Sequence, residues 1–329
     1  MIEFEQVSKS FQGKAAVSDL SLHIKEGEFA VLIGTSGCGK STTLKMINRL
    51  IEHDSGRIRF AGEEIRNFDA KALRRRMGYA IQSIGLFPHW SVAQNIATVP
   101  QLLKWPKARI NARIDELLDL LGLDTTQFRD RYPHQLSGGQ QQRVGVARAL
   151  AADPEVLLMD EPFGALDPVT RGALQQEIIR IHQLLGRTIV LVTHDIDEAL
   201  KLADRIVLMD NGQVVQQGTP LELLTRPATD FVRDFFGRSE LGVRLLSLRL
   251  VADRVRIEER IAGEPISETL SLREALSLFV DRQCQQLPVV NQRGEPSGVL
   301  HFSDLIQGEK MQGETVWGEK VGSENAPAS

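Results

Sequence analysis

Eight residues near the amino terminus have the types and spacing of a loop that holds phosphate groups. They are Gly34, Thr35, Ser36, Gly37, Cys38, Gly39, Lys40 and Ser41, and Thr42 continues them into a helical run. Glycine lets backbone N–H groups curl around an anion, and the helix start adds partial positive charge. We expect residues 34–42 to bind the phosphates of ATP, with Lys40 on the β and γ phosphates and the Ser41 hydroxyl on Mg²⁺. Cys38 fills a position that tolerates variation.

Two carboxylates follow the apolar run 156–159. Parallel strands end at one edge of a sheet, so Asp160 and Glu161 are expected beside the phosphate loop. There Asp160 would hold Mg²⁺, directly or through water, and Glu161 would orient and polarise the water that attacks the γ phosphate. Taken alone, an Asp-Glu pair is more often a helix cap or a solvated turn, so this interpretation depends on the phosphate loop.

A third cluster, Leu136-Ser137-Gly138-Gly139-Gln140, opens a helical run that extends to Leu150. Taken alone it is an ordinary Ser-capped helix. Its glycine pair lets backbone approach an anion, and the helix start supplies partial positive charge. We therefore treat it as a second candidate for contact with phosphate.

Alternating β-branched runs and helical segments predict an α/β domain with a mostly parallel sheet. A helical subdomain is expected between the second and third strands, where apolar residues recur at helical spacing from Ile110 to Leu121. An Asn-Gly turn at 211–212 predicts a hairpin that closes the sheet. The predicted strands are 29–33, 78–81, 156–159, 189–192 and 206–209.

The character of the sequence changes near Gly237. We expect one domain over 1–236, a linker over 237–265, and a small α+β module over 266–308. The residues 309–329 are rich in Gly, Glu, Lys and Ser and are expected to be disordered.

Composition excludes several classes of protein. The chain has 329 residues, 42% of them hydrophobic and 25% charged, which is typical of a soluble globular protein. A net charge of −4 argues against nucleic acid as a partner. Its two cysteines form neither a metal-binding pattern nor a disulfide framework, so we expect a reducing cytoplasm. No signal peptide is visible, and the apolar runs are far shorter than the roughly 20 residues of a membrane helix.

Taken together, the motifs resemble those of the ABC transporter ATPases over residues 1–236. The resemblance implies a P-loop NTPase of ABC type, with a RecA-like parallel sheet core, an antiparallel β subdomain and an inserted helical subdomain. It also implies a head-to-tail dimer with a second copy of the chain. Ser137, Gly138, Gly139 and Gln140 of one copy would then contact the γ phosphate held by the other.

The resemblance assigns four further positions. Phe11 is similar to the aromatic residue that stacks on adenine, and Gln82 to the glutamine that senses Mg²⁺ and links to the transport subunits. Residues 164–167 resemble the loop through which the two copies touch. His194, after the strand 189–192, resembles the switch histidine that contacts the γ phosphate. Lys40, Gln82, Glu161 and His194 are thus the implied catalytic residues, and Ser41, Gln82 and Asp160 the implied Mg²⁺ ligands.

Three segments resemble the importers of quaternary amines, which take up glycine betaine, choline and related osmoprotectants. They are 44–50, 82–90 and 95–100. This implies two transmembrane permease subunits, an external solute-binding protein, and a location at the cytoplasmic face of the inner membrane. The region 266–308 is similar to a single CBS module. His301 stands where nucleotide-binding CBS modules usually have Ser or Thr, so a dimer support is at least as well indicated as a sensor.

Two alternatives remain open from the sequence. One keeps the importer mechanism and changes the cargo to an amino acid or another small solute. The other is a non-transport ABC ATPase of DNA repair or translation. Such proteins typically carry a long coiled coil or two ATPase units, and this chain shows neither.

Overall fold

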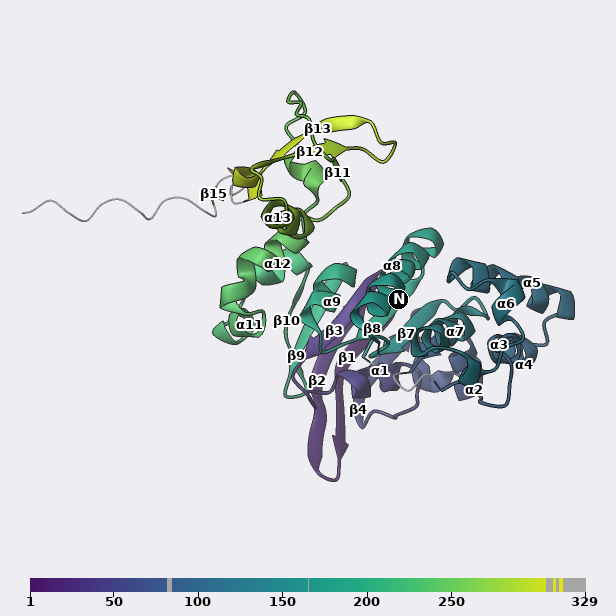
Figure 1. Ribbon diagram of the computed structural model, residues 1–329. Coiled ribbons are helices and arrows are strands. Elements are labelled where there is room, and N and C mark those ends of the chain that lie inside the picture. The colour runs from purple at the N-terminus through teal and green to yellow at the C-terminus, as the bar shows by residue number, and fades with distance from the viewer. Residues whose placement is uncertain (82–84, 165, 306–309, 312–313, 316–329) are drawn as a thin grey trace, which may run out of the picture. The chain divides into compact units, whose positions relative to one another are not determined.

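The computed structural model describes residues 1–81, 85–164, 166–305, 310–311 and 314–315. These residues form two compact units, Met1–Phe236 and Gly237–Ser329 (Figure 1). We describe each unit by itself, beginning with the one that contains the predicted phosphate loop.

A six-stranded sheet lies at the centre of the first unit, in the order β10-β9-β3-β8-β7-β6. Five strands are parallel, and β10 pairs antiparallel with β9 through the turn at Asn211-Gly212. Every residue of β3, β7 and β8 is buried, because other elements of the unit pack on both faces of the parallel sheet. All five predicted strands are present. The bounds are β3 Phe29–Gly34, β6 Met77–Ala80, β7 Val156–Asp160, β8 Thr188–Val192, β9 Arg205–Asp210 and β10 Gln213–Gly218.

A second, antiparallel sheet in the same unit has the order β2-β1-β4-β5. Its apolar side chains, such as Ile2 and Phe60, share one core with Leu32 and Val190 of the parallel sheet. The bounds are β1 Ile2–Phe11, β2 Lys14–Ile24, β4 Ser55–Phe60 and β5 Glu63–Glu64, followed by the 3-10 turn η1 Ile65–Asn67 and helix α2 Ala70–Arg75.

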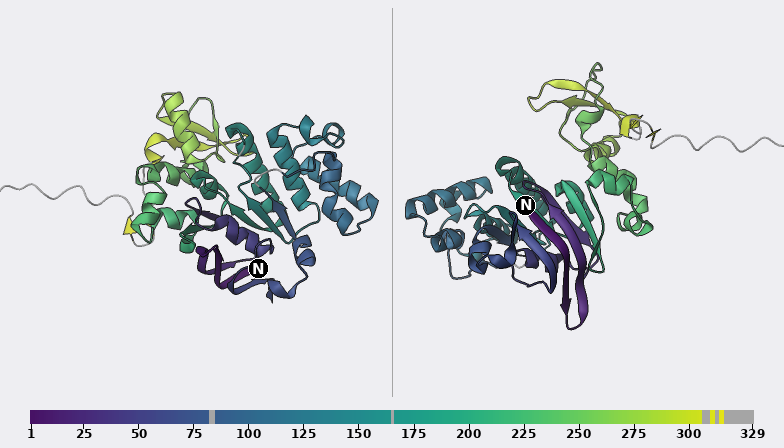
Figure 2. Two further views of the ribbon diagram at one scale, coloured as in Figure 1. Left: turned by 90° about the horizontal axis from the view of Figure 1, so that it is seen from below. Right: turned by 180° about the vertical axis from the view of Figure 1, so that it is seen from behind.

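The expected helical subdomain lies between β6 and β7. Its helices α3 to α6 lie together at one side of the unit (Figures 1 and 2). Ile110, Ile114, Leu117 and Leu118 form the buried face of α5, at the helical spacing seen in the sequence. The bounds are α3 Val92–Ile96, α4 Thr98–Leu102, α5 Lys107–Leu120, α6 Thr125–Phe128, η2 Pro133–Gln135 and α7 Gly138–Leu150.

Helices α1, α8 and α9 follow the parallel strands β3, β7 and β8, and α10 and α11 follow β10. Helices α1 and α9 both pack on β3, which places their first turns at the carboxyl edge of the sheet. The bounds are α1 Lys40–Ile47, α8 Pro168–Leu185, α9 Ile196–Leu202, α10 Pro220–Thr225 and α11 Asp230–Phe235. The parallel sheet, packed against helices and against the antiparallel sheet, is the α/β architecture that the sequence predicts.

The second unit has a three-stranded sheet, β11-β12-β13, and a core that includes Phe279 of α13 and Leu300 of β13. This is the small α+β module expected from the sequence. Its elements are η3 Arg238–Glu240, α12 Leu241–Ser247, η4 Val251–Arg254, β11 Ile266–Ser267, α13 Leu272–Asp281, β12 Gln286–Val290, β13 Pro296–His301 and η5 Phe302–Leu305.

The structure corrects one boundary of this unit. Residues 237–265, expected as a linker, belong to the folded module. Val251 is fully buried in its core, and the backbone of Arg256 pairs with Val299 of β13. The sequence pattern missed this because the segment has few apolar residues, and their burial depends on partners about 20 to 50 positions away.

The end of the chain is described only in part. Of the expected tail 309–329, the structure describes two short strands, β14 Lys310–Met311 and β15 Glu314–Thr315, and the other residues lie outside the described part. Among the helices it does describe, none is long and apolar enough to cross a membrane.

Candidate nucleotide-binding and catalytic site

The phosphate loop joins β3 to α1 and depends on glycine at two close backbone contacts. A Cβ atom at Gly34 would lie 2.0 Å from the Met209 carbonyl oxygen, and one at Gly39 would lie 2.4 Å from the Ala16 carbonyl oxygen. Both glycines also have positive φ angles, of 153° and 104°. The loop backbone therefore packs directly against the backbone of Met209 and Ala16 at these two glycines and continues into α1.

Lys40 is buried at the start of α1. Its Nζ atom donates hydrogen bonds of 2.9 Å to the carbonyl oxygens of both Gly34 and Thr35. The ammonium group is therefore held inside the curve of the loop, where it can attract an anion. Cys38 is also buried, with its sulfur 3.6 Å from the same Nζ atom. Its tight fit explains why a small side chain occupies this position.

Ser41 and Asp160 meet across the junction between α1 and the end of β7. The Ser41 hydroxyl donates a hydrogen bond of 2.8 Å to Oδ1 of Asp160. On the other carboxylate oxygen, Lys45 Nζ lies at 3.4 Å and the Tyr79 hydroxyl at 3.5 Å. Burial, and then the nearby Asp160 carboxylate, raise the pKa of Tyr79 far above its usual range, so this hydroxyl stays protonated and donates.

Glu161, the next residue, has a positive φ of 46°. This left-handed conformation is uncommon for a residue with a side chain, and such strain occurs often at functional sites. Its backbone N–H donates 2.9 Å to the Val192 carbonyl oxygen, which ties it to the end of β8. Its Oε2 atom lies 3.4 Å from Nδ1 of His194. The turn thus aims Glu161 at the histidine, whose side chain is 66% accessible to solvent.

A cavity of about 40 Å³ lies beside this pair. It is large enough for about one water molecule. Glu161 and His194 line one part of it, and buried Glu198 lines another. Burial raises the pKa of Glu198, while the Thr193 hydroxyl donates a 2.5 Å hydrogen bond to it. The site therefore combines two carboxylates in different environments with room for water.

The Leu136–Gln140 motif caps α7 as a Ser-led helix start. Ser137 Oγ accepts from the Gln140 backbone N–H at 3.3 Å, and Gln140 Oε1 accepts from the Ser137 N–H at 2.9 Å. This reciprocal pair is a capping box, which leaves the Ser137 and Gly138 positions on the surface. Gly139 is buried against α8. The motif therefore presents a helix start, with its partial positive charge, at the protein surface.

Residues 164–167 connect Glu161 to α8. Asp167 caps that helix by accepting hydrogen bonds from the backbone N–H groups of Val169 and Thr170. Ala165 lies outside the described residues. The loop therefore follows Glu161, a predicted catalytic carboxylate, and ends at Asp167, the cap of α8.

Phe11 and Gln82 are the two remaining residues predicted for the site. Phe11 is the last residue of β1, and 45% of its surface is exposed, so the ring is available for stacking. Lys9 Nζ lies 5.3 Å from the ring centre. Gln82 lies outside the described residues, and its predicted role stays a prediction. Six residues that were not predicted from the sequence contact the site: Lys45, Tyr79, Arg171, Thr193, Asp195 and Glu198.

Exposed aromatic rings follow position 82 along the chain. Phe87 and Trp90 are 44% and 39% exposed, and their ring centres lie 4.6 Å apart. Buried Asn95 of α3 holds this segment through hydrogen bonds to the Phe87 backbone N–H and to the Phe87 and Trp90 carbonyl oxygens. The pair is therefore a fixed apolar surface.

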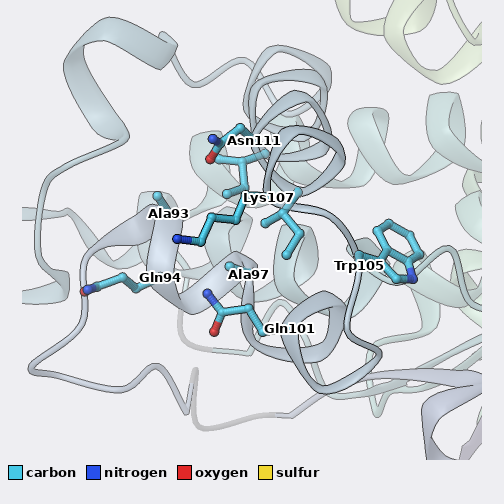
Figure 3. Close-up of a pocket in the computed structure, with 9 residues that line it drawn as sticks. Ala93, Gln94, Ala97, Gln101, Trp105, Lys107 and Asn111 are labelled. Carbon is cyan, nitrogen blue, oxygen red and sulfur yellow. The ribbon is translucent and has the colours of Figure 1, made fainter.

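A larger pocket of about 440 Å³ opens in the helical subdomain, on the helix that carries Asn95. Figure 3 shows Lys107 and Gln101 extending into the space between their helices, with Trp105 at one end. Two residues of α3, the residue that follows it and three residues of α5 complete the lining: Ala93, Gln94, Ala97, Ile110, Asn111 and Ile114. It is a concave surface of mixed character, distinct from the phosphate loop.

The described residues fit a magnesium–nucleotide complex. Mg²⁺ is held in many phosphate-binding sites by one carboxylate, one hydroxyl, phosphate oxygens and water. Ser41 and Asp160 supply such a pair within hydrogen-bond distance of each other. No group of three or more His, Cys, Asp or Glu side chains in the described residues forms an all-protein metal site.

Comparisons with known proteins agree with this geometry. The sequence matches the ABC transporter family over residues 17–164 and the CBS domain family over residues 264–309. It is 76% identical to the glycine betaine uptake system ATP-binding protein YehX of Escherichia coli (strain K12), over 93% of this chain and 99% of that one. It is 49% identical to the glycine betaine/carnitine/choline transport ATP-binding protein OpuCA of Bacillus subtilis (strain 168), over 94% of this chain and 80% of that one.

A solved structure matches the first unit. It is the dimeric post-hydrolysis state of the ATP-binding cassette MJ0796, bound to ADP and Pi, which is 32% identical. The match has a TM-score of 0.60 and covers 67% of this chain and 99% of that one. The predicted fold class and the predicted family are therefore both confirmed. The chain belongs to the ATP-binding proteins of ABC transporters, with a CBS domain after its nucleotide-binding unit.

Proposed function

We propose that this chain hydrolyses ATP to power the import of glycine betaine or a related quaternary amine such as choline. One observation supports the cargo class most strongly. The matches to the glycine betaine and choline transport proteins span 306 and 313 residues, and so continue past Phe236 through most of the second unit. A likeness limited to the shared ATPase machinery would end near that residue.

The catalytic part of the proposal assigns one task to each group. The phosphate loop and Lys40 bind the phosphates of ATP, and Ser41 with Asp160 and Gln82 would hold Mg²⁺. Bound Mg²⁺ would neutralise phosphate charge. Glu161 accepts a proton from the attacking water and orients it, and His194 contacts the γ phosphate. Phe11 stacks on the adenine ring.

The proposed active unit is a head-to-tail dimer of two copies. Ser137, Gly138, Gly139 and Gln140 of one copy contact the γ phosphate bound by the other. The exposed Ser137 and Gly138 at the start of α7 support this, because that helix start faces solvent in the single chain. The dimeric state of the structurally similar cassette supports it as well.

Two permease subunits complete the transporter in this proposal. We place their docking surface on the Phe87–Trp90 segment and on the α3–α5 pocket, which are joined through α3 and Asn95. Filling the pocket by Ala97→Trp should then abolish copurification with the permease, while ATP binding, measured in parallel, reports intact folding. Copurification at the wild-type level would remove the pocket from the docking surface.

The chain would lie on the cytoplasmic face of the inner membrane, bound to that permease, and an external solute-binding protein would deliver the cargo. The experiment is to reconstitute the chain with its permease and binding protein in liposomes and measure ATP hydrolysis. Glycine betaine or choline should stimulate hydrolysis. Stimulation by an amino acid, with none by any quaternary amine, would overturn the cargo assignment and leave the ATPase assignment intact.

A further inference from the structure

The first turns of α7 and α8 touch through Gly139 and Thr170. A Cβ atom added at Gly139 would lie 2.1 Å from Cγ2 of Thr170, far inside the contact distance of two carbon atoms. At Gly138 an added Cβ would meet none of the described atoms within 4 Å. The two neighbouring glycines therefore differ, since packing within the chain requires glycine at position 139 and not at 138.

Thr170 is also attached to the loop that ends at Asp167. Its backbone N–H donates a 3.0 Å hydrogen bond to Oδ1 of Asp167. Hydrogen bonds from the Thr170 side chain and backbone hold the pKa of Asp167 below its usual value, so the cap is ionised at neutral pH. Thr170 thus presents its methyl group to α7 and its polar groups to the loop.

We propose that Thr170 is a positioning residue that fixes the start of α7 relative to the Gly164–Asp167 loop. This inference rests on the proposed contact of Ser137 with the nucleotide of a second copy. Ser137 lies two positions before Gly139, and Asp167 lies three positions before Thr170. The start of α7 and the Gly164–Asp167 loop are the two segments proposed to face the second copy. The Gly139–Thr170 contact therefore positions both of them.

The contact is sensitive because protein interiors are close-packed. An added methyl group at position 139 overlaps Thr170 Cγ2, so the threonine must leave its present rotamer or the two helix starts must move apart. A shift of the start of α7 displaces Ser137 from its proposed place against the nucleotide of the second copy, and a displacement of about 1 Å can lower turnover about 10²-fold. Gly139→Ala should therefore act within its own chain, whereas Gly138→Ala changes an exposed surface.

The test uses the full-length chain and the substitution Thr170→Ser. This change removes Cγ2 but keeps the hydroxyl, and the nearest Thr170 atoms left to an added Cβ lie at 3.4 and 3.7 Å. Gly139→Ala alone should lower kcat for ATP hydrolysis by about 10-fold or more, with KM for ATP changed less than about 3-fold. Gly139→Ala with Thr170→Ser should recover most of that loss. Gly138→Ala is the matched control, and Thr170→Ser should not restore it.

Several results would overturn the proposal: an unchanged kcat in Gly139→Ala, no recovery in the double variant, or equal recovery of both glycine variants. If Gly139→Ala fails to fold, Thr170→Ser must restore the melting temperature and turnover together. Failure of the proposed function is a separate result. There Ser137→Arg would leave turnover normal, while Thr170→Ser would still raise the melting temperature of Gly139→Ala, because that readout depends only on the contact within the chain.

Discussion

The Ser41 hydroxyl donates a 2.8 Å hydrogen bond to Oδ1 of Asp160, which joins the first turn of α1 to the last residue of β7. These residues are 119 positions apart in the chain, and their contact creates the oxygen pair proposed for Mg²⁺. Lys45 Nζ lies 3.4 Å from the other carboxylate oxygen and helps to orient it.

Asp160→Asn should keep the shape of this contact and remove its charge. An amide oxygen can still accept from Ser41, but it binds Mg²⁺ far more weakly than a carboxylate does. We expect ATP hydrolysis to fall by about 10²-fold or more and to require higher Mg²⁺. Hydrolysis rates measured across a Mg²⁺ titration check this. A wild-type Mg²⁺ dependence would show that Asp160 has another role.

Ser137→Arg should block turnover without weakening ATP binding to the isolated chain, because the serine serves the nucleotide of the other copy. Ser271→Arg is the matched control, since Ser271 caps α13 with the same capping box. Each substitution removes a cap worth about 1 kcal/mol. Hydrolysis and nucleotide binding are measured on both variants. If Ser137→Arg reduces binding to the monomer, the role across the dimer is wrong.

Phe11→Ala should weaken ATP binding by about 5- to 10-fold, because the lost ring is worth about 1 kcal/mol of stacking. Phe11→Trp should retain binding. Phe231→Ala removes a ring of similar exposure, 37% against 45%, from α11 and serves as the control. Titration with a fluorescent ATP analogue measures the three affinities. Equal affinities for Phe11→Ala and wild type would place adenine elsewhere.

Much of this site could be predicted from sequence because its residues sit at fixed offsets from strand ends. β7 and β8 are short and wholly buried parallel strands, so the acidic pair at the end of β7 and His194 after β8 had to reach one sheet edge. Lys45 and Tyr79 could not be found this way. Each lies on an element with many neighbours, and only the packing of α1 and β6 against β7 brings it to Asp160.

The same limit applies to Gly139 and to residues 237–265. The sequence presents Gly138 and Gly139 as equivalent, and the contact with Thr170 that separates them spans two helices. Val251 looked like part of a linker because its core partners come later in the chain. In both cases the deciding contact is tertiary, which local pattern does not contain.

The second unit should lose stability in acid through Asp304. Burial alone would raise the pKa of this carboxyl, but hydrogen bonds from Arg256, at 2.7 and 3.0 Å, outweigh burial and hold its pKa below the ordinary 3.8. A lowered folded-state pKa gives stability that is present above 3.8 and is lost as pH falls through the folded-state pKa.

Asp304→Asn should therefore speed amide exchange in β13 near about pH 7, and its difference from wild type should shrink as pH falls below about 4. Hydrogen exchange of the full chain, compared at equal pH, gives this difference. Asp281→Asn removes an exposed carboxylate from the same unit and should leave exchange unchanged. A difference that grows towards acid would contradict the sign of the pKa shift.

Hydrolysis by Glu161→Gln tests the central claim most directly. The amide keeps the size of the side chain next to His194 but cannot accept a proton from water. We predict that this variant binds ATP with wild-type affinity, loses at least about 10²-fold in hydrolysis, and accumulates as an ATP-bound dimer in size-exclusion chromatography. Normal turnover by a monomeric Glu161→Gln chain would contradict the account.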